Sequence, residues 1–236
     1  MDYKKEIISS GSLMTHASRY NELIFKKISK YIKGRTLEFG AGTGNFSEMI
    51  SKKVPELTVI DEKKKSIDFL KQRLSNLSNV KILSSNIENL SIERYDTVIL
   101  LNVLEHIKED QKAIEKLMSV LNKDGYLIIQ VPALTYLYSD YDRMVGHHKR
   151  YHKKDIQIIC KKLNLNVIDL YYFNPIGAFG WWYNYCFKKK TEKNSEEKND
   201  TINQLKIYDK YIVPLIDAFD SRYNPFGISL FTIIKK

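Results

Sequence analysis

Three histidines in this chain are placed where they can take part in acid–base chemistry. His106 directly follows an apolar run that is typical of a buried strand, and His147 and His148 lie in the segment Gly146-His147-His148-Lys149-Arg150-Tyr151. Imidazole is the side chain best suited to accept a proton near neutral pH, so we expect one of these histidines to act as a base. Arg150 can hold a carboxylate or phosphate through two parallel hydrogen bonds. The phenols that can line a site for a sugar or polar ring are Tyr138, Tyr141 and Tyr151.

Each of these residues also has a purely structural interpretation. His106 can hydrogen-bond across the start of a helix that Glu105 caps, since polar residues at helix N-termini need no ligand to explain them. The basic cluster at 147–150 can bind an anionic acceptor without moving a proton. The sequence leaves both alternatives open.

A glycine-rich loop is the clearest binding motif of the chain. The apolar run Leu37-Glu38-Phe39 is followed by Gly40, Gly42 and Gly44, and glycine allows sharp turns and lets a ligand approach the main chain. A dinucleotide fingerprint would require its third glycine at position 45, which is Asn45. The spacing therefore argues against a nicotinamide oxidoreductase.

Polar residues follow the next two predicted strands. Asp61 ends the β-branched run 57–60, about twenty residues after the glycine loop, and can accept hydrogen bonds from both hydroxyls of a ribose. Asn86 follows the strand predicted at 80–83, and its side-chain oxygen can accept a hydrogen bond from an amine. Ile87 can offer an apolar face or a backbone amide to an adenine ring, although packing in the core explains it equally.

Strand-like and helical segments alternate from Gly34 to Pro132, in the order βαβαβαβαβ. This order predicts an α/β fold with a parallel sheet, right-handed crossovers and helices on both faces. Ligands of such sheets bind outside the carboxyl ends of the strands. The polar or turn residues expected at those ends are Glu38, Asp61, Asn86, Asn102 and Pro132.

The segment 35–44 resembles the first motif of class I S-adenosylmethionine-dependent methyltransferases, and Leu104-Glu105-His106 resembles their motif after the fourth strand. The blocks after Pro132, including G-H-x-x-R-Y, resemble a subgroup often associated with glycosyltransferases. The resemblance implies a Rossmann-like, doubly wound, mostly parallel seven-stranded sheet with a C-terminal aromatic cap. It implies cofactor contacts by Glu38, which would face the methionine ammonium, and by Gly40, Gly42, Gly44, Asp61, Asn86, Ile87 and Asn102.

The resemblance also sets the expected chemistry. It implies transfer of a methyl group from S-adenosylmethionine, which leaves S-adenosylhomocysteine, to an oxygen of a sugar, glycan-type or lipid-linked acceptor. The alternatives are an RNA methyltransferase and a non-catalytic protein that binds the cofactor. Some related enzymes hold a metal with an E-x-x-E-H motif, but Asn102 replaces the first Glu here, so we expect no metal.

Length and composition favour a single domain over residues 1–236, which the resemblance implies to be a methyltransferase domain. The chain is 43% hydrophobic, which is enough for one full core. We divide it into a helical lead-in at 1–33, a cofactor-binding core at 34–132 and an acceptor-side elaboration at 133–236. The polar segment 188–200 contains five lysines and four acids, so it is nearly neutral, and its composition predicts a flexible loop. Because we find no signal peptide and no long apolar run, we expect a cytoplasmic protein.

The net charge of +10 allows nucleic acid as a partner, but lysines are spread along the whole chain, and we consider nucleic acid an improbable substrate. Tryptophans, tyrosines and a lysine cluster share residues 176–190. Such a segment suits peripheral contact with the inner membrane face. It equally suits a cap whose aromatic residues are buried against 207–216.

Overall fold

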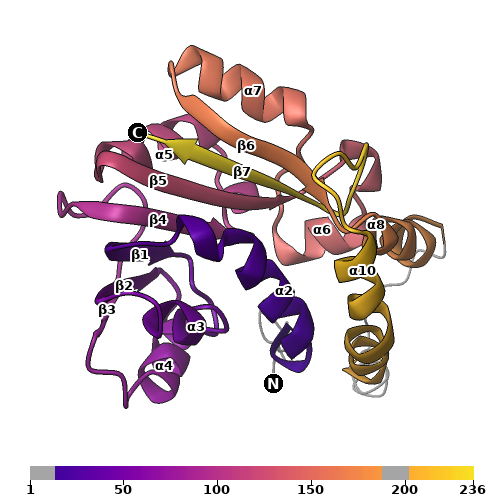
Figure 1. Cartoon of the computed structure of the whole chain (residues 1–236), viewed down its shortest axis with the longest axis horizontal. Helices are drawn as coiled ribbons and strands as arrows, with labels where there is room; N and C mark the ends of the chain where they lie inside the picture. Colours follow the sequence, from indigo (N-terminus) through magenta and orange to yellow (C-terminus); the bar gives the residue numbers. More distant parts are fainter. Residues whose placement is uncertain (1–13, 188–201) are drawn as a thin grey trace, which may run out of the picture.

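The computed structural model describes residues 14–187 and 202–236, and a seven-stranded sheet lies at its centre (Figure 1). The strand order is β3-β2-β1-β4-β5-β7-β6, and every pairing is parallel except those of β7 with β5 and β6. This arrangement confirms the predicted fold class. The strands are β1 (Arg35–Phe39), β2 (Glu56–Asp61), β3 (Val80–Ser84), β4 (Tyr95–Leu101), β5 (Leu121–Pro132), β6 (Asn166–Phe173) and β7 (Ser229–Lys235).

Helices and short helical turns join these strands within the described residues. The α-helices are α2 (Ser18–Ile28), α3 (Ser47–Ser51), α4 (Lys64–Arg73), α5 (Asp110–Ser119), α6 (Asp140–Val145), α7 (Lys153–Lys162), α8 (Pro175–Trp181) and α10 (Val213–Phe219). The turns of 3-10 or π type are η1 (Met14–His16), η2 (Ser29–Tyr31), η3 (Leu104–His106), η4 (Thr135–Leu137), η5 (Trp182–Phe187) and η6 (Tyr208–Ile212).

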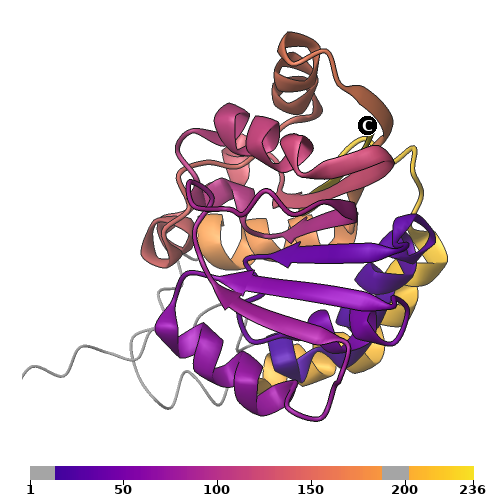
Figure 2. The same ribbon diagram turned by 90° about the vertical axis from the view of Figure 1, so that its left-hand side faces the viewer.

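Helices cover both faces of the sheet, as Figure 2 shows. The strands alternate between two apolar cores: Val98 and Leu100 of β4 belong to one, and Ile99 between them belongs to the other. Alternation follows from the two-residue period of a strand, and apolar residues on both faces are expected where helices cover both. The first core takes in α5 and α7, while the second takes in α2, α3, α4 and α10.

The carboxyl ends of the central strands meet at one edge. Phe39 of β1 is level with Ile60 of β2, and Leu101 of β4 is level with Gln130 of β5. The strand order reverses between β1 and β4, because β2 and β3 extend to one side and β5, β7 and β6 to the other. Open α/β sheets bind ligands at such a switch point.

Two details differ from the predicted pattern. No helix connects β3 to β4 in this described stretch, where Asn89 N donates to Asn86 Oδ1 at 3.0 Å and Leu90 N donates to Ile87 O, which makes a single turn that does not continue into a helix. The predicted turn at Asp124 lies inside β5, where Asp124 has a φ of +62° and the register with β4 shifts. Pro132 ends β5 as expected.

The acceptor-side region also contributes to the sheet, since β6 and β7 both fall within 133–236. The lead-in helix α2 lies beside α10, as Figure 1 shows, and ion pairs join Lys26 to Asp217 and Lys27 to Asp220 at 3.0 and 2.7 Å. The first thirteen residues of the predicted lead-in and the whole predicted loop at 188–200 lie outside the described residues.

Candidate active site

A pocket of about 710 Å³ opens at the carboxyl ends of β1, β2, β4 and β5. Pockets of this size commonly hold small molecules and cofactors. It brings together residues that are far apart in the sequence, from the glycine loop to the histidine cluster. The predicted site residues that line it are Gly40, Gly42, Asp61, Asn86, Ile87, Asn102, His106, Tyr141, His147, His148 and Arg150.

The glycine loop forms one wall of this pocket. Gly40, Gly42 and Gly44 all have positive φ, between +58° and +75°, which side chains of L-residues rarely adopt. A Cβ at Gly40 would lie 2.5 Å from Val103 Cγ2, whereas a Cβ at Gly42 would have no protein atom within 4 Å. Gly42 therefore leaves open space over the loop, as a bound cofactor requires, while Gly40 is needed for close packing.

Asp61 holds the loop from the neighbouring strand. Its Oδ2 accepts a hydrogen bond from Gly42 N, and its Oδ1 accepts one from Lys63 N, both at 2.9 Å. A carboxylate oxygen can accept more than one hydrogen bond, so both keep capacity for a ligand. Asn86 also lines the pocket, with its Oδ1 already engaged in the turn to Asn89.

Glu38 lies beneath the glycine loop and is 3% exposed. Its Oε2 accepts a hydrogen bond from Ser47 Oγ, and burial raises the pKa of its carboxyl to about 7. Glu38 and Gly44 are not among the residues that line the pocket in the described part of the chain. The structure thus places Glu38 where it supports the loop, in contrast to the direct contact with the methionine ammonium that the resemblance implies.

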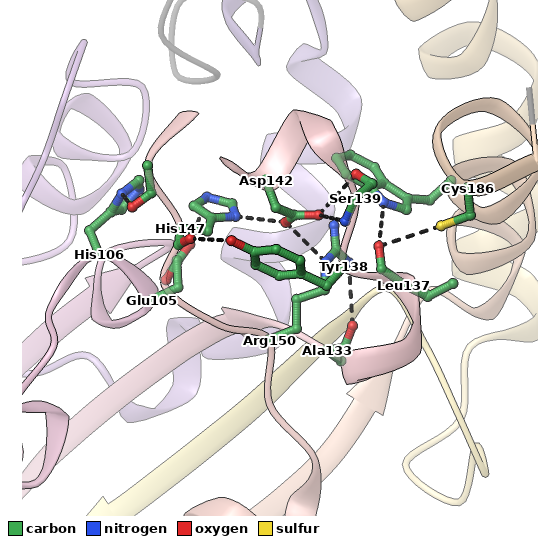
Figure 3. Close-up of polar contacts among 12 residues, drawn as sticks. Glu105, His106, Ala133, Leu137, Tyr138, Ser139, Asp142, His147, Arg150 and Cys186 are labelled. Carbon is green, nitrogen blue, oxygen red and sulfur yellow. Dashed lines mark hydrogen bonds and ion pairs between the residues drawn. The ribbon is translucent and has the colours of Figure 1, made fainter. Parts of the chain in front are cut away.

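A buried carboxylate, Asp142, organises the histidine side of the pocket (Figure 3). Its Oδ1 accepts hydrogen bonds from His147 Nδ1 at 2.8 Å and from Arg150 Nε at 3.0 Å. Burial alone would raise the pKa of Asp142, but the hydrogen bonds from His147 and the charge of Arg150 hold it below its usual value. Since an ionised carboxylate only accepts, Nδ1 of His147 donates this hydrogen bond, and in the tautomer of neutral imidazole that does so Nε2 carries the lone pair.

Glu105 and His106 complete this side of the pocket. Glu105 is fully buried, neither of its carboxylate oxygens makes a hydrogen bond, and burial raises its pKa to about 8. His106 Nδ1 lies 3.2 Å from Gly146 O, and its ring contacts that of His147 edge to face, with centroids 4.7 Å apart. Burial lowers the pKa of His106 to about 4, so this ring is neutral at pH 7. The predicted capping role of Glu105 is not observed.

Three predicted substrate residues need correction. The guanidinium of Arg150 is buried, paired with Asp142 and stacked 4.4 Å from the Trp181 ring, so it is not free to grip an acceptor. Tyr151 is fully buried, and its hydroxyl donates to Asp110 Oδ2 at 3.1 Å. The Tyr138 hydroxyl donates to the backbone oxygen of His147 at 2.7 Å, which fixes the histidine loop (Figure 3). Tyr138 and Tyr151 support the site from behind its lining, whereas Arg150 lines the pocket with its guanidinium committed to Asp142.

The aromatic segment has two different sides. Ala178, Trp181 and Tyr185 face the protein, where Trp181 Nε1 donates to Leu137 O at 3.1 Å and the ring of Tyr141 packs against both aromatic residues. This side agrees with the predicted cap. The other side is exposed and carries Ile176, Phe179, Trp182, Tyr183 and Phe187.

The predicted burial of these aromatic residues against 207–216 is not observed for this exposed side, because Ile207, Tyr211 and Leu215 are themselves exposed. Within the described residues, no helix has both the length and the apolar character needed to cross a bilayer.

Residues 16–170 match a family model described as a methyltransferase domain. The chain belongs to this methyltransferase family. The match confirms, at the level of the family, the resemblance carried by the glycine loop and the Leu104-Glu105-His106 motif, and it supports S-adenosylmethionine as the cofactor. The more specific subgroup associated with glycosyltransferases stays a prediction.

Individual relatives of this methyltransferase domain are distant. It is 27% identical over 113 residues to an uncharacterized methyltransferase of Staphylococcus carnosus, a match that covers 47% of this chain and 52% of that protein. It is 32% identical over 95 residues to a malonyl-[acyl-carrier protein] O-methyltransferase of Priestia megaterium, a match that covers 39% of this chain and 34% of that protein. The chain spans about half the length of the first of these and about a third of the second.

Solved structures share the fold of this methyltransferase domain. A putative methyltransferase from Bacillus halodurans superposes with a TM-score of 0.61 at 14% identity, covering 90% of this chain and 98% of that one. The N-methyltransferase NodS from Bradyrhizobium japonicum, solved with S-adenosylhomocysteine, superposes with a TM-score of 0.54 at 20% identity, covering 72% of this chain and 83% of that one. At these identities the likeness extends to the fold alone.

Sequence reasoning missed two residues, Asp142 behind the lining of the methyltransferase pocket and Gln130 within it. Asp142 lies three residues after Ser139, a spacing typical of a capping box, and Ser139 N does donate to Asp142 Oδ2 at 2.9 Å. Nothing in the spacing shows that the second oxygen would hold His147 and Arg150. Gln130 at the end of β5 is buried and lines the pocket, but it lies inside an apolar run.

Proposed function

We propose that the chain transfers a methyl group from S-adenosylmethionine to an oxygen of a sugar, glycan-type or lipid-linked acceptor. The observation that carries the proposal is that one pocket joins an open glycine loop, with Asp61 beside it, to the Asp142–His147 pair. The first half suits the nucleoside and amino-acid parts of the cofactor, and the second half suits an acceptor that must lose a proton. The cofactor contacts proposed for Asn86, Ile87 and Asn102 fit the same half as the loop.

Methyl transfer from a sulfonium is an in-line displacement, so the protein has to align the acceptor oxygen and remove its proton. We assign His147 as the base, because Asp142 fixes its ring and leaves Nε2 with a lone pair. His106 and Tyr141 line the acceptor side beside it. His148 lies at the exposed rim, where its backbone N donates to Glu105 O at 2.8 Å, and it is the weaker candidate.

The test compares His147→Ala with His148→Ala in two assays. Thermal shift with S-adenosylhomocysteine measures the cofactor half, and labelled methyl transfer to nucleotide sugars and lipid-linked glycans measures turnover. We expect His147→Ala to slow turnover by roughly 10²–10⁴-fold while the thermal shift is unchanged, since this is the usual contribution of a general base. His148→Ala is the control and is expected to keep most of the turnover.

The outcomes separate the competing proposals. Equal losses of turnover and of thermal shift in His147→Ala would argue against the base. A shift with S-adenosylhomocysteine but no methyl transfer to any acceptor would favour a non-catalytic cofactor-binding protein. Methyl transfer to RNA, with binding that weakens steeply as salt rises, would replace the sugar-type acceptor by a nucleic acid.

We further propose that the exposed side of the aromatic segment contacts a membrane that carries the acceptor. Ile176, Phe179, Tyr183 and Phe187 follow one another at intervals of three or four residues, which places them along one side of α8 and η5. Phe179 and Phe187 are 69% and 67% exposed, and Phe187 stacks on Trp182 and Tyr183. Exposed aromatic groups of this kind suit the interface of a bilayer.

Flotation with anionic and zwitterionic vesicles tests this contact. The double variant Phe179→Ser and Phe187→Ser is expected to lose binding to anionic vesicles, which the net charge of +10 favours. The matched control is Ile92→Ser, because Ile92 is 90% exposed but lies between β3 and β4. Equal binding by the double variant and the native chain, or no binding by either, would refute the proposal.

A further inference from the structure

Glu105, His106 and His147 each bring one possible metal-ligating atom into the same corner of the pocket (Figure 3). These three atoms lie within 4.8 Å of one another, and Glu105 Oε1 is 3.7 Å from His147 Nε2. Small rotations of the three side chains bring such atoms to the spacing of ligands around one ion. We propose that this corner binds a divalent transition-metal ion of the Zn²⁺ type.

Glu105 gives an independent reason to expect a cation. Its side chain is fully buried, and both oxygens lack a hydrogen-bond partner. A buried carboxylate without a partner is costly, and such a group is normally paired, hydrogen-bonded or bound to a metal. The guanidinium of Arg150 is already paired with Asp142, and His147 Nε2, at 3.7 Å from Glu105 Oε1, is too far away to donate a hydrogen bond to it.

The two histidines are oriented as metal ligands. His106 Nδ1 faces Gly146 O, and His147 Nδ1 faces the carboxylate of Asp142, so both oxygens accept and each Nε2 carries a lone pair. An imidazole whose second nitrogen is bound to a carboxylate or carbonyl is the usual arrangement around a protein metal ion. The site therefore has its outer contacts in place.

The ligand types select the ion. Two imidazoles and one carboxylate suit Zn²⁺ and its neighbours Co²⁺ and Fe²⁺ better than Mg²⁺ or Ca²⁺, which prefer oxygen ligands. Three protein ligands leave a fourth position for water or an acceptor oxygen, whose pKa the ion would lower. The ion would use the same Nε2 of His147 that would otherwise take the acceptor proton, so metal binding and the base role exclude each other at that atom.

The proposed site does not use the position of the E-x-x-E-H motif that Asn102 occupies here. The spacing of that motif supplies only Glu105 and His106, and the third ligand comes from the loop after α6, which the fold brings alongside. Sequence spacing alone misses a ligand that lies so far along the chain.

Titration of the full, metal-free chain with Co²⁺ tests the inference, because Co²⁺ in a site with histidine ligands gives visible d–d absorption that does not depend on turnover. We expect one ion per chain, displaced by Zn²⁺. Glu105→Gln and His106→Ala are expected to weaken binding at least about 10- to 100-fold, the loss found for the outer contacts of metal sites. The matched control is His148→Ala, which alters an exposed histidine of the same pocket and is expected to leave the spectrum unchanged.

Circular dichroism and the thermal shift with S-adenosylhomocysteine show that each variant is folded. Absence of a Co²⁺ spectrum in the native chain would overturn the metal site, as would equal loss in His148→Ala. A thermal shift without a Co²⁺ spectrum overturns the metal site alone and leaves methyl transfer standing. A Co²⁺ spectrum without a thermal shift supports the metal site and counts against the proposed cofactor.

Discussion

Replacing Gly42 by leucine is expected to separate cofactor binding from folding. Gly42 has a φ of +58°, and a Cβ built on it meets no protein atom within 4 Å. The cost to the fold is then mainly that of holding an L-residue in the left-handed region, about 1–2 kcal/mol. The added side chain extends into the pocket that we assign to the cofactor.

Thermal unfolding with and without S-adenosylhomocysteine gives both effects in one assay. For a chain of this length the backbone strain lowers Tm by roughly 2–8 °C. A ligand at a hundred times its Kd stabilises the native chain by about 2.7 kcal/mol, which corresponds to a rise in Tm of roughly 5–11 °C. In Gly42→Leu we expect the fall in Tm that the backbone strain causes, and we expect the rise in Tm with S-adenosylhomocysteine to be lost.

Gly146→Ala and Gly42→Ala provide the controls for backbone strain. Gly146 has a φ of +87°, and a Cβ there would meet only His106 Nδ1, at 3.8 Å, so the strain is similar while the cofactor loop is untouched. Gly146→Ala should keep the full ligand shift, and Gly42→Ala should give a smaller loss than leucine. A native-sized ligand shift in Gly42→Leu would refute the assignment of the loop.

Three further variants test the interior of the site. The folded chain holds the Glu38 pKa at about 7, above its usual value of 4.5, so folding keeps a proton that the unfolded chain has lost; the free energy of unfolding therefore falls by about 2 kcal/mol as pH rises from about 5 to 7, and Glu38→Gln should flatten this slope in urea titrations. Asp142→Asn leaves Arg150 buried without its counter-charge and should cost about 3–5 kcal/mol in the same measurement, so a loss below 1 kcal/mol would contradict the buried pair. Gly40→Ala forces a Cβ to within 2.5 Å of Val103 and should cost about 1–3 kcal/mol, whereas unchanged Tm would show that the loop relaxes freely.

The cofactor half of the pocket was predictable because local sequence determines it. Gly40 and Gly42 adopt a positive φ that favours glycine, and Asp61 is the last residue of its strand. The neighbouring sequence is therefore enough to predict the position of the loop and of this carboxylate. The fold class followed from the same regularity. The missing helix between β3 and β4 was not predictable from periodicity, and the structure has a single turn that begins at Asn86 in its place.

The acceptor half was only partly predictable because long-range contacts determine it. His147 was one of three predicted candidate bases, but its orientation depends on a hydrogen bond to Asp142, which the spacing of residues does not reveal. Arg150 and Tyr151 have the residue types of a substrate site, but the fold pairs each of them with a buried acid, Asp142 and Asp110 respectively. Residue type shows what a side chain can do, and burial decides whether it meets a ligand.

The place of β7 in the sheet has a consequence for synthesis on the ribosome. This strand comes last in the chain order, yet it lies between β5 and β6 and forms antiparallel ladders with both. Until residues 229–235 have left the exit tunnel, β5 and β6 each present a row of unpaired backbone groups, and such edges pair readily with other chains. Nascent chains stalled before β7 are therefore expected to need chaperones that shield strand edges, even though β1 to β5 already have their mutual partners.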